Sequence, residues 1–343
     1  MKFKIALIPG DGIGPEQLSV SMNILYKLPK LYGLDVEYIE VEAGDGCKAK
    51  RGIALPDDTL NILKESHACL KGPVGETAAE VIVRLRQLFD LYANVRPIKS
   101  YPIPIPPLRS DVDFVIVREN TEDVYRGLEF KLTPDIAVCL RIISRRACER
   151  IVRYGFDLAM TRRKKVTVVH KSNVMKISDG LFAEISRSIA REYPSVSLEE
   201  MYVDAAAYHI IMDPRRFDVI VTTNMFGDIL SDEAAALIGS LGLAPSANIG
   251  ENFALFEPVH GCAPDIAGKG IANPCSLILS ASMMFIWLGR RYNVEASIEA
   301  GIDLEKAVFN ALSEGYATPD IGGRYSSREV AEAIASKLKG YEY

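Results

Sequence analysis

The sequence lacks the features that mark membrane, secreted and nucleic-acid-binding proteins. No stretch approaches the roughly 20 apolar residues of a transmembrane helix, and the N-terminus does not follow the plan of a signal peptide. Asp and Glu (45 residues) outnumber Lys and Arg (40), and the net charge of −5 argues against a nucleic-acid-binding surface. We therefore expect a cytoplasmic protein that binds neither membranes nor nucleic acid.

Common metal- and phosphate-binding motifs are also missing. The six cysteines have no C-x-x-C spacing, which indicates neither a zinc site nor a disulfide framework and predicts reduced, mostly buried thiols. No G-x-x-x-x-G-K-[ST] sequence occurs, which argues against a P-loop NTPase. What remains is an ordinary globular composition, 48% hydrophobic and 25% charged, and at 343 residues the chain favours two domains.

Strand-like and helix-like segments alternate along most of the chain. The predicted strands are residues 3–8, 36–41, 68–70, 114–118, 166–169, 197–203 and 219–222. Helical patterns such as residues 57–66 and 144–154 lie between them, which predicts an α/β fold with a mainly parallel sheet. Ligands of such sheets collect where strands end and helices begin. The glycine-rich residues 9–16 (PGDGIGPE) form one such corner, but their spacing predicts only a tight turn.

One corner carries two carboxylates four residues apart. Residues 219–222 predict a buried strand, and a helix that follows it would place Asp228 and Asp232 on one face. Like charges held so close repel each other unless a cation lies between them. The alternative is that Asp228 caps the helix and Asp232 is solvated, which is the more common meaning of an isolated D-x-x-x-D.

Three arginines lie at the ends of other elements. Arg86 is carried by an apolar helical segment, Arg96 precedes a proline, and Arg118 ends a predicted strand. Because the guanidinium group binds carboxylates bidentately, the three could converge on one polyanion. Three unrelated surface ion pairs fit the spacing equally well.

Two further strands end in charged residues. Lys171 follows residues 166–169 and is a candidate general base, although a lysine at a strand end more often extends into water. Asp204 follows residues 197–203 and would by default cap a helix. With the D-x-x-x-D pair it makes a third carboxylate at a strand–helix junction, which favours a metal and an acid substrate.

The last third of the chain contains a long loop and an apolar helix. Residues 256–274 are rich in glycine and proline, and a loop of that length predicts a binding role. Residues 280–288 are apolar on nearly every side and should be buried, within the chain or against a second copy of it.

Five motifs together resemble those of the β-decarboxylating dehydrogenases, the family of the isocitrate, 3-isopropylmalate and homoisocitrate dehydrogenases. They are residues 9–16 (PGDGIGPE), 90–97 (DLYANVRP), 117–123 (VRENTED), 224–232 (NMFGDILSD) and 257–269 (EPVHGCAPDIAGK). They extend over essentially the whole chain, so the resemblance is far more specific than any single motif.

The resemblance implies a fold of two α/β domains around a long mixed sheet. The first domain is discontinuous, is formed by residues 1–92 and 239–343, and lies on the cofactor side. Residues 93–238 form the second domain, which carries the dimer contact, the catalytic lysine and the metal side. A homodimer with shared active sites, or a higher oligomer built from it, is also implied.

Substrate and metal residues follow from the same resemblance. Arg86, Arg96 and Arg118 match the family's clamp on the malate carboxylates of a 2-hydroxy diacid. Asp228 and Asp232 match its Mg²⁺ or Mn²⁺ ligands, with Asp204 supplied by the neighbouring subunit, and oxygen ligands suit such hard cations.

Catalytic and cofactor residues are implied in the same way. Lys171, from the neighbour, would take the hydroxyl proton during hydride transfer, and Tyr125 would protonate the enol carbon after CO₂ departs. Asp265 matches the position that holds the adenosine ribose hydroxyls in NAD-using members, and its carboxylate would repel a 2′-phosphate, so NAD is expected. The other residues expected along the cofactor are Asn173, Glu257, His260, Gly261, Ala263 and Asn273.

The helix that precedes Arg86 carries the residues that indicate the substrate. Ala79, Ile82 and Val83 would form an aliphatic wall that buries an isopropyl group, worth on the order of 1.5 to 3 kcal/mol, but cannot solvate a carboxylate. This favours oxidation of 3-isopropylmalate to 2-oxoisocaproate in leucine biosynthesis.

Isocitrate and homoisocitrate remain alternative substrates. Ala79 stands where bacterial isopropylmalate enzymes usually have glutamate, and residues 119–123 are more similar to the isocitrate and homoisocitrate members. Arg84 could bind a further carboxylate if the helix is rotated. A non-catalytic regulatory paralogue is an alternative of another class, which the presence of the base, the acid and all three aspartates disfavours.

Overall fold

The computed structural model describes residues 1–340 of the chain. Ten strands form one mixed sheet, and two form a separate hairpin. The sheet strands are β1 (Lys2–Ile8), β2 (Asp35–Glu40), β3 (Ala68–Lys71), β4 (Ala93–Lys99), β5 (Asp113–Glu119), β8 (Lys165–His170), β9 (Ser197–Tyr202), β10 (Val219–Thr222), β11 (Pro245–Ile249) and β12 (Ala254–Pro258). The hairpin consists of β6 (Glu129–Thr133) and β7 (Ile136–Cys139).

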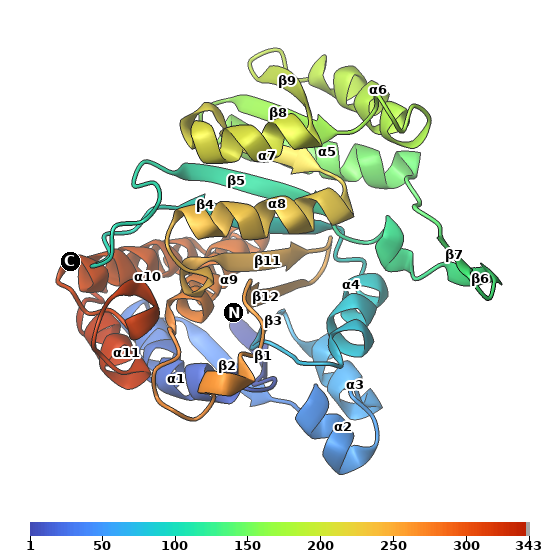
Figure 1. The fold of residues 1–343 in the computed structure, drawn as a ribbon. Helices are drawn as coiled ribbons and strands as arrows, with labels where there is room; N and C mark the ends of the chain where they lie inside the picture. Colours follow the sequence, from blue (N-terminus) through green and yellow to red (C-terminus); the bar gives the residue numbers. More distant parts are fainter. Residues whose placement is uncertain (341–343) are drawn as a thin grey trace.

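Helices cover both faces of the sheet. They are α1 (Gly14–Leu31), α2 (Asp45–Arg51), α3 (Asp57–Glu65), α4 (Arg84–Leu88), α5 (Arg145–Met160), α6 (Ser178–Ala190), α7 (Val203–Met212), α8 (Asn224–Leu237), α9 (Cys275–Tyr292), α10 (Glu295–Ser313) and α11 (Ser327–Ser336). In Figure 1, α8 crosses the front of the central strands and α9 lies behind them. No helix within residues 1–340 is both long and apolar enough to cross a membrane.

The strand order is β2-β1-β3-β12-β11-β4-β5-β10-β8-β9. Strands from residues 1–92 and 239–343 make one half of the sheet, and strands from residues 93–238 make the other. Pairing is parallel within most of each half and antiparallel where β12, β11, β4 and β5 meet. The α/β fold with a long mixed sheet is confirmed, whereas the division into two domains stays a prediction.

The predicted strands all occur, because their apolar runs are covered by helices on both faces. In β10, for example, Val219, Ile220 and Val221 are all fully buried. The prediction missed β4, β11, β12 and the β6–β7 hairpin. Residues 256–274 were expected to be a loop, but residues 256–258 belong to β12. Most of residues 280–288 are buried within their own chain, where α9 packs against β11, β12 and α10, but Met283, Ile286 and Trp287 are half-buried.

The sequence pattern predicts a helix over residues 78–91, but the helix in the structure is shorter and less regular. Residues Ala79–Val83 form a π-helical turn, α4 follows as five residues, and the helical segment ends at Leu88. All six cysteines are free, and four are buried, as the composition predicts.

Close packing of α5 on the sheet is tested by Gly155→Ala. A Cβ at this position would lie 2.2 Å from Cγ2 of Val221 on β10. We expect the substitution to lower the free energy of unfolding by about 1–3 kcal/mol, because overpacking displaces the helix or the strand. The midpoint of denaturation in urea at unchanged m-value measures the loss.

Gly180→Ala on α6 is the matched control. A Cβ there meets nothing within 4 Å, and alanine favours a helix over glycine, so this change should leave stability unchanged or raise it by up to about 1 kcal/mol. Equal losses in the two variants would contradict the packing argument.

Candidate active site

Polar side chains gather on the front face of the four central strands. Successive residues of a strand point to opposite faces. Arg96 of β4, Arg118 of β5, Asn248 of β11 and Glu257 of β12 therefore share a face with α8, while their strand neighbours face the rear. All four side chains are buried. The structure thus brings together residues from two stretches that are distant in the sequence, residues 93–119 and residues 245–258.

Arg118 is the most deeply buried of the three predicted substrate-binding arginines, at 1% exposure. Gly227 makes room for it, since a Cβ on this residue of α8 would lie 2.6 Å from Cβ of Arg118. The Arg118 Nε donates to Oδ1 of Asn224 at 2.8 Å, and Nη1 forms a short ion pair with Asp228. The buried Nη2 has no hydrogen-bond partner among residues 1–340. A buried guanidinium with a free donor is suited to bind an anion.

Arg96 and Arg86 lie beside Arg118. Arg96 donates to Ser231 Oγ at 2.6 Å and lies 3.4 Å from carboxylate oxygens of Asp228 and of Asp232. Burial, together with the charge of Arg118, lowers the pKa of Arg96 to about 10. Burial and the same neighbour also lower the pKa of Arg86. Three separate surface ion pairs, the alternative drawn from spacing, are therefore wrong: the arginines form one buried cluster.

Asp228 and Asp232 project from successive turns of α8 but differ in their surroundings. Burial alone would raise the pKa of Asp228, but Arg118 and Arg96 outweigh it and the pKa is lowered. Burial raises the pKa of Asp232 above its usual value. The Tyr125 hydroxyl donates a short hydrogen bond to Asp228, and burial raises the tyrosine pKa, so the phenol is protonated at neutral pH.

A complete metal site does not form within one chain. Among residues 1–340, no group of three or more His, Cys, Asp or Glu side chains could hold a metal ion. The two aspartates of α8 offer the oxygen donors that Mg²⁺ and Mn²⁺ prefer. Asp204, the third predicted ligand, forms a short ion pair with Lys171 instead. Asp228 and Asp232 fit a divalent ion if further oxygen ligands come from outside the chain.

Lys171 is held by a network that spacing did not predict. Its backbone N–H donates to Asp179 Oδ2 at 2.6 Å. The other oxygen of Asp179 pairs with Arg141, whose Nε donates to Asp123 at 2.8 Å, two residues before Tyr125. One arginine thus connects the segment of the candidate base to that of the candidate acid.

Asn248 is a second residue that sequence reasoning missed. Its Oδ1 accepts hydrogen bonds from Arg86 at 3.1 Å, from Asn94 at 3.2 Å and from Asn120 at 2.9 Å, and its Nδ2 donates to Glu257 at 2.9 Å. Polar and apolar residues alternate over residues 245–249 (PSANI), as in a strand with one polar face, and this is the signal that could have pointed to Asn248.

Glu257 is paired on both sides. The buried Lys71 lies 2.8 Å from Oε2, and Arg86 lies 3.5 Å from Oε1. Burial would raise the pKa of this carboxyl, but the two cations lower it to about 2. Glu257 is therefore ionised and fixed beside the arginine cluster.

The other predicted cofactor residues follow β12 and pack against the N-terminal turn. The Gln17 amide Nε2 lies 3.0 Å from His260 Nε2 and donates to the Asn273 carbonyl at 2.7 Å, while its buried Oε1 has no partner in residues 1–340. Gly12 has no room for a Cβ, which would lie 2.0 Å from the Cys262 carbonyl oxygen. The glycine-rich turn thus supports the loop, a role that its spacing did not reveal.

Several predicted ligand contacts are exposed in the single chain. Asp265, Gly261 and Ala263 lie on the surface of the loop, and Ala263 has a left-handed backbone with φ of 39°. The buried Oε1 of Gln17, which has no partner in residues 1–340, is an acceptor beside this exposed loop. Such an arrangement fits a polar cofactor. Asn173 is exposed two residues after Lys171, and no hydrogen bond joins it to Glu257 in the described chain.

The predicted aliphatic wall is only partly available. Ile82 packs into a hydrophobic cluster with Leu85 and Phe89, whereas Val83 is half-buried and Ala79 is exposed. Val83 is therefore the better placed of the two predicted substrate contacts. Arg84 is exposed.

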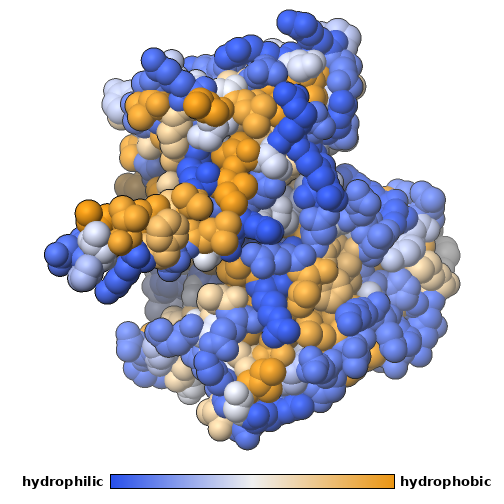
Figure 2. All heavy atoms as spheres, turned by 90° about the vertical axis from the view of Figure 1, so that its right-hand side faces the viewer, coloured by the Kyte–Doolittle hydropathy of each residue, from blue (hydrophilic) through white to orange (hydrophobic). Residues whose placement is uncertain are grey.

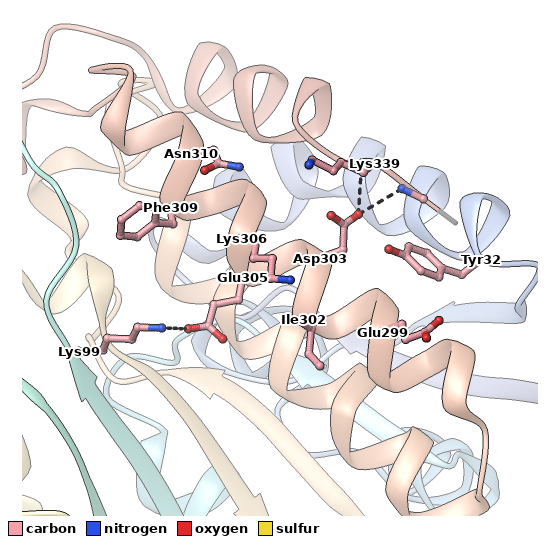
Figure 3. A pocket seen from close by; sticks show the side chains of 11 residues that line it. Tyr32, Lys99, Glu299, Ile302, Asp303, Glu305, Lys306, Phe309, Asn310 and Lys339 are labelled. Atoms are coloured by element: carbon pink, nitrogen blue, oxygen red, sulfur yellow. Dashed lines mark hydrogen bonds and ion pairs between the residues drawn. The ribbon is translucent and has the colours of Figure 1, made fainter. Parts of the chain in front are cut away.

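A separate pocket of about 730 Å³ lies along α10. Figure 3 shows its lining, which includes the ion pair of Lys99 and Glu305, and none of the predicted site residues takes part. We place the active site at the arginine cluster because charge and burial converge there.

The chain matches a known protein family. Residues 4–334 match the family described as isocitrate/isopropylmalate dehydrogenase. The 3-isopropylmalate dehydrogenase of Sulfurisphaera tokodaii is 53% identical over 339 residues, which cover 98% of this chain and 100% of that protein. The isocitrate/homoisocitrate dehydrogenase of Thermus thermophilus is 45% identical over 346 residues, 99% of each chain.

The fold is shared as well. A crystal structure of isocitrate dehydrogenase from Methylococcus capsulatus superimposes with a TM-score of 0.90 at 43% identity, over 98% of this chain and 99% of that one. The chain belongs to the isocitrate/isopropylmalate dehydrogenase family.

Proposed function

We propose that this protein oxidises and decarboxylates 3-isopropylmalate to 2-oxoisocaproate, a step of leucine biosynthesis, with NAD and Mg²⁺ or Mn²⁺. The observation that carries the proposal is the buried arginine cluster, in which Arg118 has a free donor, opposite Asp228 and Asp232. Such a site suits a small diacid and a hard divalent cation together.

Binding and orientation fall to the arginines. Arg86, Arg96 and Arg118 grip the two malate carboxylates, and Asn248 and Glu257 hold Arg86 in place. Because these guanidinium groups are already positioned by buried partners, little rearrangement is needed when substrate binds.

Two residues move protons. Lys171, from the neighbouring subunit, accepts the proton of the substrate hydroxyl as the C–H hydride leaves. The bond to the carboxyl group then breaks, CO₂ departs, and Tyr125, protonated and bonded to Asp228, donates a proton to the carbon left behind. When bound, NAD supplies the hydride acceptor, and the divalent ion held by Asp204, Asp228 and Asp232 supplies Lewis-acid polarisation of the carbonyl.

A homodimer is part of the proposal. The β6–β7 hairpin projects from the body, and Phe130, Leu132 and Ile136 on it are exposed (Figure 1). Figure 2 shows hydrophobic residues gathered on this arm. Near Lys171, Val174 is 68% and Ile177 is 90% exposed. Apolar surface of this extent favours association, and a partner seated there could bring Lys171 and Asp204 to the other chain's site.

Specificity for the isopropyl group is assigned to Val83, which is aliphatic, half-buried and directly before α4, the helix that carries Arg86. The 53% identity to an enzyme named 3-isopropylmalate dehydrogenase, against 45% to an isocitrate/homoisocitrate enzyme, supports the same choice. The six free cysteines support a reducing compartment, and we place the enzyme in the cytoplasm.

The substrate is tested by comparing kcat/KM for 3-isopropylmalate, isocitrate and homoisocitrate, each with NAD and Mn²⁺. We expect 3-isopropylmalate to lead by at least about tenfold, because an aliphatic wall leaves a third carboxylate without a partner. If isocitrate or homoisocitrate leads by that factor, the substrate assignment is wrong while the family is unaffected.

The cofactor is tested by Asp265→Lys. Replacing the exposed carboxylate with a cation removes repulsion of a 2′-phosphate, so the NAD/NADP ratio of kcat/KM should fall at least about tenfold. Glu251→Lys, which makes the same charge change at the opposite end of β12, is the control and should leave the ratio unchanged. An unchanged ratio in the Asp265 variant would refute the assignment.

Shared active sites are tested by mixing two inactive variants, Lys171→Ala and Asp228→Asn. If each site combines Lys171 of one subunit with Asp228 of the other, a mixed dimer has one intact site. Random exchange then restores roughly a quarter of wild-type activity, because half of the dimers are mixed. Each variant alone should stay inactive, and a mixture without recovered activity would show that the two residues act within one chain.

A further inference from the structure

A second cavity lies directly behind the arginine cluster, on the rear face of the sheet. It has a volume of about 410 Å³, and its floor includes Val95, Val115, Ala247 and Phe256. Each of these residues lies one or three positions from a site residue of the same strand. Because side chains alternate along a strand, theirs point to the opposite face. We call this cavity the rear pocket.

The walls of the rear pocket are largely apolar and come from two helices. Tyr154 and Leu158 on α5 line one side, and Met283, Ile286 and Trp287 on α9 line the other. The three α9 residues are half-buried, because neither the sheet nor α10 covers this side of the helix. A pocket of this volume and lining matches the size of common small-molecule sites.

The rim contains charged residues, and most of them are already paired. Lys99 lies 2.5 Å from Glu305, a pair also visible in Figure 3, and Arg162 lies 2.8 Å from Asp113. Arg290, in the last turn of α9, forms no ion pair within residues 1–340. The unpaired charge at the rim is therefore positive.

Tyr154 adds a free hydrogen-bonding group. Its ring packs against the hydrophobic core, and its hydroxyl makes no hydrogen bond to residues 1–340. A phenol in a largely apolar lining normally finds a partner. With Arg290, it offers a donor and a cation above an apolar floor, which is the complement of an anionic group on an apolar body.

We propose that the rear pocket binds a small amphipathic carboxylate, with its apolar part between α5 and α9 and its carboxylate on Arg290. The pocket joins both halves of the sheet, since β4 and β5 form part of the floor and β11 and β12 the rest. Its occupant is therefore in contact with the strands that carry Arg96 and Glu257. Binding alters the grip on substrate without competing for it, which makes the rear pocket an effector site.

Direct binding is measured through Trp287, the only tryptophan of the chain. Octanoate is the probe, and octan-1-ol is the uncharged control of the same length. We expect a saturable change in tryptophan emission with octanoate, and binding of octan-1-ol at least about fivefold weaker, because the alcohol has no charge for Arg290. No saturable change with octanoate would overturn the proposal.

Arg290→Gln separates the carboxylate contact from general apolar binding. It should weaken octanoate about fivefold or more and leave octan-1-ol unaffected. Arg291→Gln is the matched control, because Arg291 occupies the same last turn of α9 but donates to Asn252. Equal effects of the two substitutions on octanoate would overturn the assignment of Arg290.

Steady-state kinetics test the position of the rear pocket independently of substrate identity. Octanoate should change kcat, or kcat and KM together, for whichever diacid the enzyme prefers. Purely competitive inhibition against that diacid, with Trp287 emission unchanged, would place octanoate in the active site and overturn the proposal. Neither outcome depends on 3-isopropylmalate being the substrate.

Discussion

The site depends on keeping three arginine side chains charged while they are buried. Removing a cation from water costs several kcal/mol unless other groups replace the solvent, and here each guanidinium has such partners. Asp228 faces Arg96 and Arg118, while Glu257 and Asn248 face Arg86. Because these partners come from β11, β12 and α8, the sheet must assemble before the cluster can exist. The cluster is thus a product of the whole fold and not of one motif.

The partners of Asp228 have a consequence for the proposed reaction. In the chain alone this carboxylate is shared by two arginines and the Tyr125 hydroxyl. In the proposed reaction, substrate carboxylates compete with Asp228 for the same guanidinium groups, and this competition leaves Asp228 available to a cation. Substrate and metal would then favour each other's binding, since each removes a charge that would otherwise oppose the other.

Predictability from sequence differed between kinds of residue. Buried strands such as residues 219–222 were predictable because an apolar run has one simple use in a parallel sheet. β4 was missed because Asn94 and Arg96 interrupt a continuous apolar run, although these polar residues alternate with apolar ones and face the site. Asn248 and Lys71 were missed for a different reason: their roles depend on elements that are adjacent in space but distant in sequence. The motifs located the charged residues, whereas only the sheet order explains why they meet.

Substrate selection is the feature for which counting along a helix fails. An α-helix turns by roughly 100° per residue, so a spacing of four keeps residues on one face, but a π-helical turn adds one residue and shifts every later position. The turn Ala79–Val83 lies immediately before α4, which carries Arg86. Ile82 consequently belongs to the core, while Val83 and the exposed Ala79 lie nearer to solvent. A relative with the same residues but an ordinary α-helix here would present different side chains to the site. In the proposed site, substrate selectivity would therefore depend on this backbone irregularity as much as on the residues of the helix.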